Sequence, residues 1–333
     1  MSTVTLRDVA WRAGVSEMTV SRVLRNSGYV APATRERVLR AAAALEYVPN
    51  RIAGSLAQQR TNLVAVLVPS MTNQVYPEVL SGVARGLEGA SLQPVFGITG
   101  YDLHIEEGLV RDMISWRPSG IAVAGLRHTA ATRAMLRATS IPVAEMMDTD
   151  GRVVEFAVGL SHRHAGGIVA EHLIGKGYRS IAYVAHNYRF DFTARKRFKA
   201  FAKVMNESGL NLVKTVIGRE PSSPLLGRRL TREVLDGSRP IDAIYYSNDD
   251  MAMGGMMHCL ANGIRVPDSV ALCGYSGFSL AYALPMQLTT VVSPRFEIGR
   301  EAARYIVERL GGSRPAKPVR RVLPFEFVAG QTS

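Results

Sequence analysis

Cysteine and long hydrophobic runs are both scarce in this sequence. Its 333 residues include two cysteines, Cys259 and Cys273, and neither lies in a CxxC or Cys/His spacing typical of a metal site. Two cysteines cannot form a disulfide framework, so we expect both to be buried as apolar side chains. No apolar run approaches the roughly 20 residues needed to cross a bilayer, and the N-terminus lacks the hydrophobic core of a secretion signal. These absences predict a cytoplasmic protein.

Motifs that would indicate catalysis are also missing. The sequence contains no phosphate-binding loop, nucleophile elbow, HExxH or GxGxxG. His162, His164 and His172 come closest to a metal-ligand set, but an HxH followed eight residues later by another histidine fits no common ligand spacing. We therefore expect neither an enzyme nor a bound metal or cofactor.

Charge is concentrated at the start of the chain. The net charge is +12, and residues 1–60 contain nine arginines against four acidic residues, nearly half of the excess in less than a fifth of the length. Such a basic surplus favours contacts with nucleic-acid phosphates. The surplus in the rest of the chain is consistent with either general solubility or an anionic small ligand, and composition does not separate the two.

The first sixty residues have the pattern of three short helices. Apolar residues recur at helical spacing over Leu6–Ala13, and Gly14 ends this first helix. Ser16 is placed to cap a second helix. A third helix is predicted from Pro32 to about Leu45; it has Ala31 in place of a polar cap, for which Pro32 at the first helical position partly compensates.

The second of these helices has two different faces. Val20 and Val23 belong to an inner apolar face, whereas the outer face is polar and suited to the major groove of DNA. The alternative is an ordinary helical hairpin with a solvated basic face. If it binds DNA, we expect Met18, Ser21 and Arg22 to contact base edges, and the flanking polar residues to hold phosphates. The residues predicted at this interface are Thr5, Ser16, Glu17, Met18, Thr19, Ser21, Arg22 and Arg25.

Several motifs in the sequence resemble the lactose-repressor family of bacterial transcription factors. In the N-terminal region these are Val4-Thr-Leu-Arg-Asp-Val-Ala, Ala13-Gly-Val-Ser, Thr19-Val-Ser-Arg-Val-Leu and Tyr47-Val-Pro-Asn-Arg. The resemblance continues through nearly the whole chain, and later segments are similar to the gluconate-repressor branch of the family. Those segments are Thr72-Asn-Gln-Val-Tyr, Met113-Ile-Ser-Trp, Ile141-Pro-Val-Ala-Glu-Met-Met-Asp and Asn248-Asp-Asp-Met-Ala.

A hinge is predicted between the two parts of the chain. Asn50 can cap a helix of about two turns over Arg51–Gln58, which is too short to persist alone in water. In the family this segment folds when two copies meet at the centre of the operator, and the resemblance implies that Leu56, with Ala53 one turn earlier, wedges into the minor groove. The alternative is that Leu56 packs within a linker.

The rest of the chain has the pattern of a doubly wound α/β structure. Continuous apolar runs alternate with helical patterns, as expected for parallel strands covered on both faces. The predicted strands are Leu63–Val68, Pro94–Ile98, Gly120–Ala124, Ile141–Met146, Ile181–Val184, Ile241–Ser247, Val270–Gly274 and Thr289–Val292.

The family resemblance implies how these parts are divided. Residues 1–49 form the helix-turn-helix DNA-binding domain, 50–62 the hinge and linker, and 63–333 a periplasmic-binding-protein-like effector and dimerisation domain. This domain has two lobes, an N-lobe of about 63–160 and 293–322 and a C-lobe of about 161–290 and 323–330. The chain is expected to cross between them near Gly159, near Thr290 and close to Leu323.

A small ligand is expected between the lobes, beyond the carboxyl ends of the strands. Polar residues follow several predicted strands: Ser70, Asn73, Asp148, Ser247, Asn248, Asp249 and Ser276. Ser276 stands where repressors for neutral sugars tend to have an aspartate, and losing that negative charge favours an anionic ligand.

Two arginines predict that the ligand carries a carboxylate, which a guanidinium can bind bidentately. Arg197 matches the arginine that reaches effectors throughout the family, and Arg295 follows the expected crossing near Thr290. Alternatively, Arg295 is a surface residue paired with Glu297 or Glu301. Arg127 and His128 could add positive charge at the rim, but an exposed loop pair is the favoured interpretation.

These features predict a homodimeric repressor that binds double-stranded operator DNA and is allosterically controlled by a sugar acid. The effector would be gluconate or a keto or phosphorylated relative, and the protein would be nucleoid-associated when bound to DNA. The alternatives are a corepressor-type regulator that responds to another small molecule, and a solute-binding receptor without a DNA target.

Overall fold

The computed structural model describes residues 4–25, 28–48 and 60–333. It divides into two compact units, Met1–Thr61 and Asn62–Ser333, which are described separately. The predicted hinge helix, with Asn50, Ala53 and Leu56, lies outside the described residues and stays a prediction. Within the described ranges, no helix has both the length and the apolar character needed to span a membrane.

The first unit is a bundle of three helices: α1 (Leu6–Ala13), α2 (Glu17–Leu24) and α3 (Pro32–Ala44). Val9, Val20 and Val38 are completely buried at its centre. The predicted caps are confirmed: the Ser16 side chain accepts from the backbone N–H of Thr19, and Ala31 gives α3 no side-chain cap. The helices therefore begin where the sequence predicts.

The core predicted for α3 is wrong at one position. Helical spacing predicts Val38, Leu39, Ala42 and Leu45 as the core positions of this helix, but Leu39 is 48% exposed. Its neighbours Val38, Ala41 and Ala42 are the buried ones, because the small alanines allow α3 to pack closely against α1 and α2. The buried face of α3 is thus rotated about the helix axis relative to the face that the sequence predicts.

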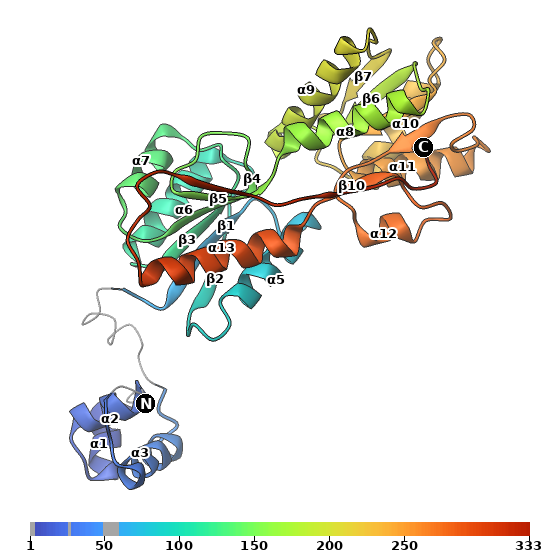
Figure 1. Cartoon of the computed structure of the whole chain (residues 1–333). Helices are drawn as coiled ribbons and strands as arrows, with labels where there is room; N and C mark the ends of the chain where they lie inside the picture. The colour runs from blue at the N-terminus through green and yellow to red at the C-terminus, as the bar shows by residue number, and fades with distance from the viewer. Residues whose placement is uncertain (1–3, 26–27, 49–59) are drawn as a thin grey trace. The chain divides into compact units, whose positions relative to one another are not determined.

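The second unit begins with an N-lobe built on a six-stranded parallel sheet (Figure 1). The strand order is β11-β5-β4-β3-β1-β2. Helices α5 and α13 pack on one face of this sheet, and α6 and α7 on the other. The bounds are β1 (Leu63–Val68), β2 (Gln93–Ile98), β3 (Gly120–Ala124), β4 (Val143–Asp148), β5 (Phe156–Leu160), β11 (Val319–Val322), α5 (Val75–Gly86), α6 (Leu103–Ser115), α7 (Ala130–Ala138) and α13 (Arg295–Leu310).

The C-lobe repeats this arrangement on a four-stranded parallel sheet of order β7-β6-β8-β9. Helices α8 and α9 pack on one face, and α10 and α11 on the other. The bounds are β6 (Ile181–Ala185), β7 (Lys214–Ile217), β8 (Ala243–Tyr246), β9 (Ala271–Cys273), α8 (His162–Gly175), α9 (Phe192–Glu207), α10 (Pro224–Leu235), α11 (Asp249–Ala261), with a 3-10 turn η1 (Tyr188–Phe190) and a short helix α12 (Ser279–Tyr282).

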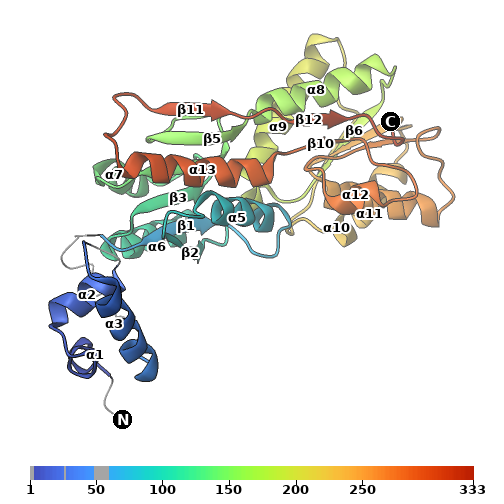
Figure 2. The same ribbon diagram turned by 60° about the horizontal axis from the view of Figure 1, so that its bottom comes forward.

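Three segments connect the lobes (Figures 1 and 2). The chain passes from β5 directly into α8, from β10 (Thr290–Val292) into α13, and from β11 to β12 (Glu326–Val328). β10 and β12 pair with each other as an antiparallel ribbon on the C-lobe side. As a result, the two sheets meet with their strand ends facing the space between the lobes.

The predicted doubly wound fold is confirmed, and all eight predicted strands are found within two residues of their expected bounds. Both cysteines are buried, as expected. Four further strands, β5, β7, β11 and β12, were not predicted. β7 and β11 are edge strands without a continuous apolar run, and every residue of β11 is exposed. Strands without a continuous apolar run, such as β7 and β11, are therefore not revealed by this pattern.

Candidate functional site

The outer face of α2 presents exposed side chains at the positions predicted to read bases. Met18 is 65% exposed, and Arg22 is exposed as well. Ser21 is partly buried and accepts a hydrogen bond from the guanidinium of Arg25. In this state Arg25 is therefore folded back onto its own helix.

Residues at the start of α1 and α2 are engaged in helix caps. The Thr5 hydroxyl donates to the Asp8 carboxylate at 2.7 Å, which lowers the pKa of Asp8. The Ser16 and Thr19 hydroxyls are 3.0 Å apart, and Glu17 is exposed in the first turn of α2. A phosphate is favoured near such helix N-termini by the helix dipole.

A cavity of about 930 Å³ lies between the two lobes of the second unit. Side chains from both lobes line it, and they come from the carboxyl ends of strands and from α8 and α9. Cavities of this size at strand ends are the usual binding sites of small molecules. Of the predicted effector residues, those that line the cavity are Asn73, Asp148, Arg197, Asn248 and Ser276.

Arg197 is the most buried charged residue of the cavity, with 1% of its surface exposed. Its guanidinium lies 3.6 Å from the centre of the Tyr275 ring and donates to the carboxylate of Asp191 at 3.0 Å and to the backbone oxygen of Ser247 at 2.9 Å. Within the described structure its Nε has no hydrogen-bond partner. Arg197 therefore joins α9 to the end of β8 at the cavity wall.

Asp191 is a site residue that the sequence prediction missed. It caps α9 by accepting from the backbone N–H groups of Thr193 and Ala194. Burial works to raise the pKa of Asp191, but the Arg197 charge, His186 and the hydrogen bonds from Thr193 and Ala194 together outweigh burial, and the pKa lies well below its ordinary value. The positive charge of Arg197 is thus already balanced within the protein.

His162, considered above as a metal ligand, is instead a link between the lobes. Its Nε2 is 2.9 Å from the backbone oxygen of Met147, which can only accept, so Nε2 carries the hydrogen. Nδ1 then accepts from Arg197 at 3.2 Å and lies 3.2 Å from the Tyr275 hydroxyl. Burial and the nearby Arg197 charge lower the pKa of His162, which keeps the ring neutral.

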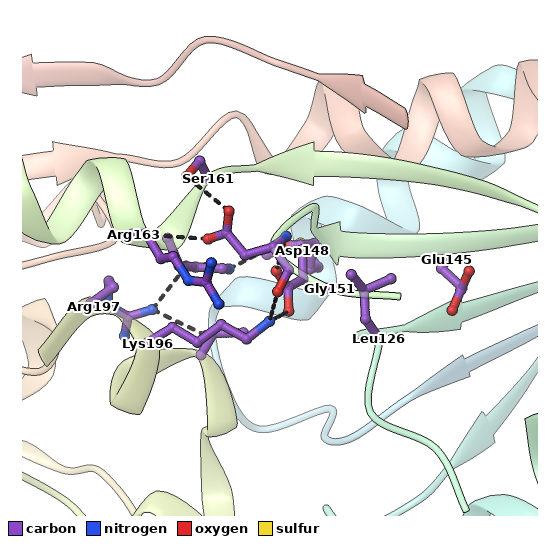
Figure 3. Close-up of polar contacts among 12 residues, drawn as sticks. Leu126, Glu145, Asp148, Gly151, Ser161, Arg163, Lys196 and Arg197 are labelled. Atoms are coloured by element: carbon purple, nitrogen blue, oxygen red, sulfur yellow. Dashed lines mark hydrogen bonds and ion pairs between the residues drawn. The ribbon is translucent and has the colours of Figure 1, made fainter. Parts of the chain in front are cut away.

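A second ion pair spans the cavity between Asp148 of β4 and Lys196 of α9 (Figure 3). Asp148 is almost fully buried, and Lys196 also donates to the backbone oxygen of Asp150 at 2.9 Å. The same view shows Arg163 and Arg197 in this part of the site. Lys196 was not predicted, although it directly precedes Arg197 in the sequence.

Four predicted effector residues do not line the cavity, and three of them are short polar side chains. Ser70 closes a turn by accepting from the backbone N–H groups of Thr72 and Asn73. Ser247 is completely buried against His186, and Asp249 accepts from the Thr290 hydroxyl at 2.6 Å. These side chains form hydrogen bonds within the protein next to the strand ends, and they do not line the cavity in which an effector would bind.

The prediction for Arg295 also requires correction. Arg295 is buried and makes a two-pronged ion pair with Glu78 of α5, with both N–O distances 3.0 Å. It also donates to the backbone oxygens of Ser276 and Gly277 in the C-lobe. It is neither among the residues that line the cavity nor paired with Glu297 or Glu301, so it acts as a clamp between the lobes.

The expectation that Arg127 and His128 form an exposed loop pair is half correct. Arg127 is exposed, lines the cavity, and lies 3.9 Å from the centre of the Phe192 ring. The His128 side chain is completely buried between Glu106 and Glu145. The sequence pattern did not predict that His128 is buried between two glutamates, because Glu106 lies 22 residues earlier in the chain and Glu145 lies 17 residues later.

Comparison with known proteins identifies both units. Residues 5–50 match the family of bacterial regulatory proteins of the lacI type, and residues 170–333 match a periplasmic binding protein-like domain. The chain is 33% identical to the transcriptional regulator GntR of Pseudomonas aeruginosa over 92% of this chain and 90% of the relative. A solved lacI-family regulator from Silicibacter pomeroyi is 46% identical, with a TM-score of 0.93 over 99% of both chains.

A more distant structure bears out the fold. The lac repressor dimer bound to operator is 24% identical and has a TM-score of 0.88 over 99% of both chains. These relatives are transcription regulators and not enzymes. This protein therefore belongs to the lacI family of bacterial regulatory proteins, with a helix-turn-helix unit that binds DNA and a two-lobed unit that binds an effector.

Proposed function

We propose that this regulator is a homodimeric repressor that leaves its operator when the cavity binds a sugar acid such as gluconate. The observation that carries the proposal is the basic wall that the C-lobe gives to the cavity. Arg197 and Lys196 are each balanced by a carboxylate, but Arg163, Arg195 and Lys199 also line this wall and are exposed. Their uncompensated positive charge attracts an anionic ligand.

Release from DNA requires the acid to prefer one arrangement of the lobes. A ligand shifts an equilibrium only through its difference in affinity for the two states. Moving a population from 1:99 to 99:1 takes about 5.5 kcal/mol of differential binding. The contacts that cross the cavity, Lys196 with Asp148 and His162 with Met147, are those that an effector can rearrange.

The effector class is tested by calorimetry on the full chain with gluconate and with glucose, which lacks the carboxylate. We expect gluconate to bind more tightly, and Arg197→Gln to lose most of that affinity. Arg232→Gln is the control: it removes the same charge from an exposed arginine of the C-lobe that does not line the cavity, so acid affinity should be retained. Equal affinity for glucose and gluconate would remove the charge argument.

The repressor role is tested by gel shift with added gluconate. Release of operator DNA supports the proposal, whereas tighter DNA binding would make the protein a corepressor-type regulator. Leu56→Ala should weaken operator binding and leave acid binding unchanged, because the residue is expected to wedge between base pairs at the operator centre. For the same reason, inserting one base pair there should damage binding severely, since it separates the two half-sites of a dimer.

A further inference from the structure

A charged histidine is buried behind the N-lobe wall of the cavity. Nδ1 of His128 is 2.7 Å from Oε1 of Glu106, and Nε2 is 3.2 Å from Oε1 of Glu145. Carboxylates can only accept hydrogen bonds, so both ring nitrogens must carry hydrogen and the ring is an imidazolium. Burial alone lowers the pKa of His128, but the hydrogen bonds to the two glutamates and their negative charges together raise it to about 9.

The three side chains join separate elements of the N-lobe. Glu106 belongs to α6, Glu145 to β4, and His128 to the loop before α7. Glu145 also accepts from the backbone N–H of Val154 at 2.5 Å, which ties the group to the segment before β5. Two carboxylates and one imidazolium leave one net negative charge, and Glu106 is the member that lines the cavity.

The two walls of the cavity therefore differ in charge. Among the described lining residues, the N-lobe contributes three carboxylates, those of Asp102, Glu106 and Asp148, against a single basic residue, Arg127. The C-lobe contributes six basic residues and two acidic ones, Asp191 and Glu207. The six are Arg163, Arg195, Lys196, Arg197, Lys199 and Lys203. A ligand that fits both walls is anionic at the end toward the C-lobe and carries no negative charge at the end toward the N-lobe.

Building on the proposed sugar-acid effector, we infer that Glu106, held in place by His128 and Glu145, determines specificity for acids with a single anionic group. A ligand hydroxyl donates to the Glu106 carboxylate, a charge-assisted hydrogen bond that an uncharged acceptor would make more weakly. A second carboxylate at that end of the ligand meets a like charge and is rejected. The effector is then a polyhydroxy monoacid, bound with its carboxylate toward the C-lobe.

The inference is tested with gluconate and glucarate, which differ only in that the terminal CH2OH of gluconate is a carboxylate in glucarate. Calorimetry on the full chain should give at least about tenfold tighter binding of gluconate, as expected for one repulsive charge in a partly desolvated site. In Glu106→Gln the amide oxygen can still accept from His128 while the charge is lost. The preference for gluconate should then fall by about fivefold or more.

Asp112→Asn is the matched control, because Asp112 is an exposed carboxylate on the same helix and does not line the cavity. Its gluconate preference should equal that of the wild type, and thermal unfolding of each variant checks the fold. Comparing the two acids on the wild type needs no variant, so equal affinities overturn the inference even if Glu106→Gln does not fold. An unchanged preference in folded Glu106→Gln also overturns it.

The same measurements distinguish failure of the proposed function from failure of this inference. If neither acid binds to the wild type, both the sugar-acid proposal and this inference are wrong. If gluconate binds but is not preferred to glucarate, the sugar-acid effector stands and only the role of Glu106 is wrong.

Discussion

The two units of this protein place their functional side chains in opposite environments. On α2 the candidate base-reading residues Met18 and Arg22 are exposed to solvent. In the cavity Asp148 and Arg197 are buried, and each also holds two elements together. A substitution on the DNA-binding face should therefore change DNA binding alone, whereas one in the cavity should change effector binding and stability together.

Arg197→Gln should give the largest effect, because it removes the positive charge beside Asp191. Breaking a buried ion pair leaves an uncompensated charge, and we expect a loss of about 3 kcal/mol in the free energy of unfolding. This loss is at the lower end of the range for buried ion pairs, because the Asp191 side chain is 23% exposed. Urea unfolding of the full chain measures it.

Arg195→Gln is the control for this experiment, since Arg195 is an exposed arginine on the same helix. It should unfold like the wild type, because exposed charges contribute little to stability. A folded Arg197→Gln variant with unchanged stability would contradict the view that cavity residues also hold the fold together.

The stability of the effector unit should decrease in mildly alkaline solution. The folded pKa of His128, about 9, lies above its ordinary value of 6.5. The stabilisation by the protonated ring is therefore fully present below pH 6.5 and lost as the pH rises through 9. We expect about 3 kcal/mol from this residue.

Thermal unfolding of the wild type and of His128→Gln between pH 6 and 10 measures this contribution, and the difference between the two proteins should shrink as the pH rises. Residues 1–61 contain no histidine, so the first unit provides an internal control. If the difference between the proteins does not depend on pH, His128 is not protonated in the folded state.

Arg22→Ala should reduce the preference for the matched operator by about 1 to 3 kcal/mol, the usual value of a bidentate arginine to guanine. Because Arg22 is exposed, stability should not change. Arg25→Ala should weaken binding to all sequences alike, as expected for a phosphate contact. Gel-shift titrations on matched and mismatched operators decide between these roles, and equal loss on both for Arg22→Ala rules out base reading.

Ala31→Ser should give the smallest effect, a gain of about 1 kcal/mol in the stability of the DNA-binding unit. Ala31 is the residue at the N-cap position of α3 but has no side chain that can accept a hydrogen bond from the helix. Circular dichroism of thermal unfolding measures the gain. Ala43→Ser, an exposed site inside α3, is the control and should be slightly destabilising.

Most of the fold could be predicted from local patterns. The helices of the first unit have caps and breaks within a few residues, and the interior strands are continuous apolar runs. The missed strands β7 and β11 lie at sheet edges, where one side is open to solvent and the residues need not be apolar. Their pairing with β6 and β5 depends on contacts between distant parts of the chain.

The site was less predictable, because residue type and position in sequence do not reveal where a side chain points. Arg197 and Arg295 have the same chemistry and both lie near a lobe boundary, yet only Arg197 lines the cavity. The partner of Arg295, Glu78, is 217 residues away in sequence. The same holds for Glu106, His128 and Glu145, which belong to three separate elements.

The three crossings between the lobes have a consequence for the order in which the chain can fold. The N-lobe sheet is complete only when β11 pairs with β5, and one of its faces is covered only when α13 packs beside α5. Both late elements are synthesised after the whole of β6 to β10 in the C-lobe. During synthesis the apolar face around Val66 and Ala144 therefore stays open until the second lobe has emerged. Such exposed surface is where nascent proteins aggregate or recruit chaperones.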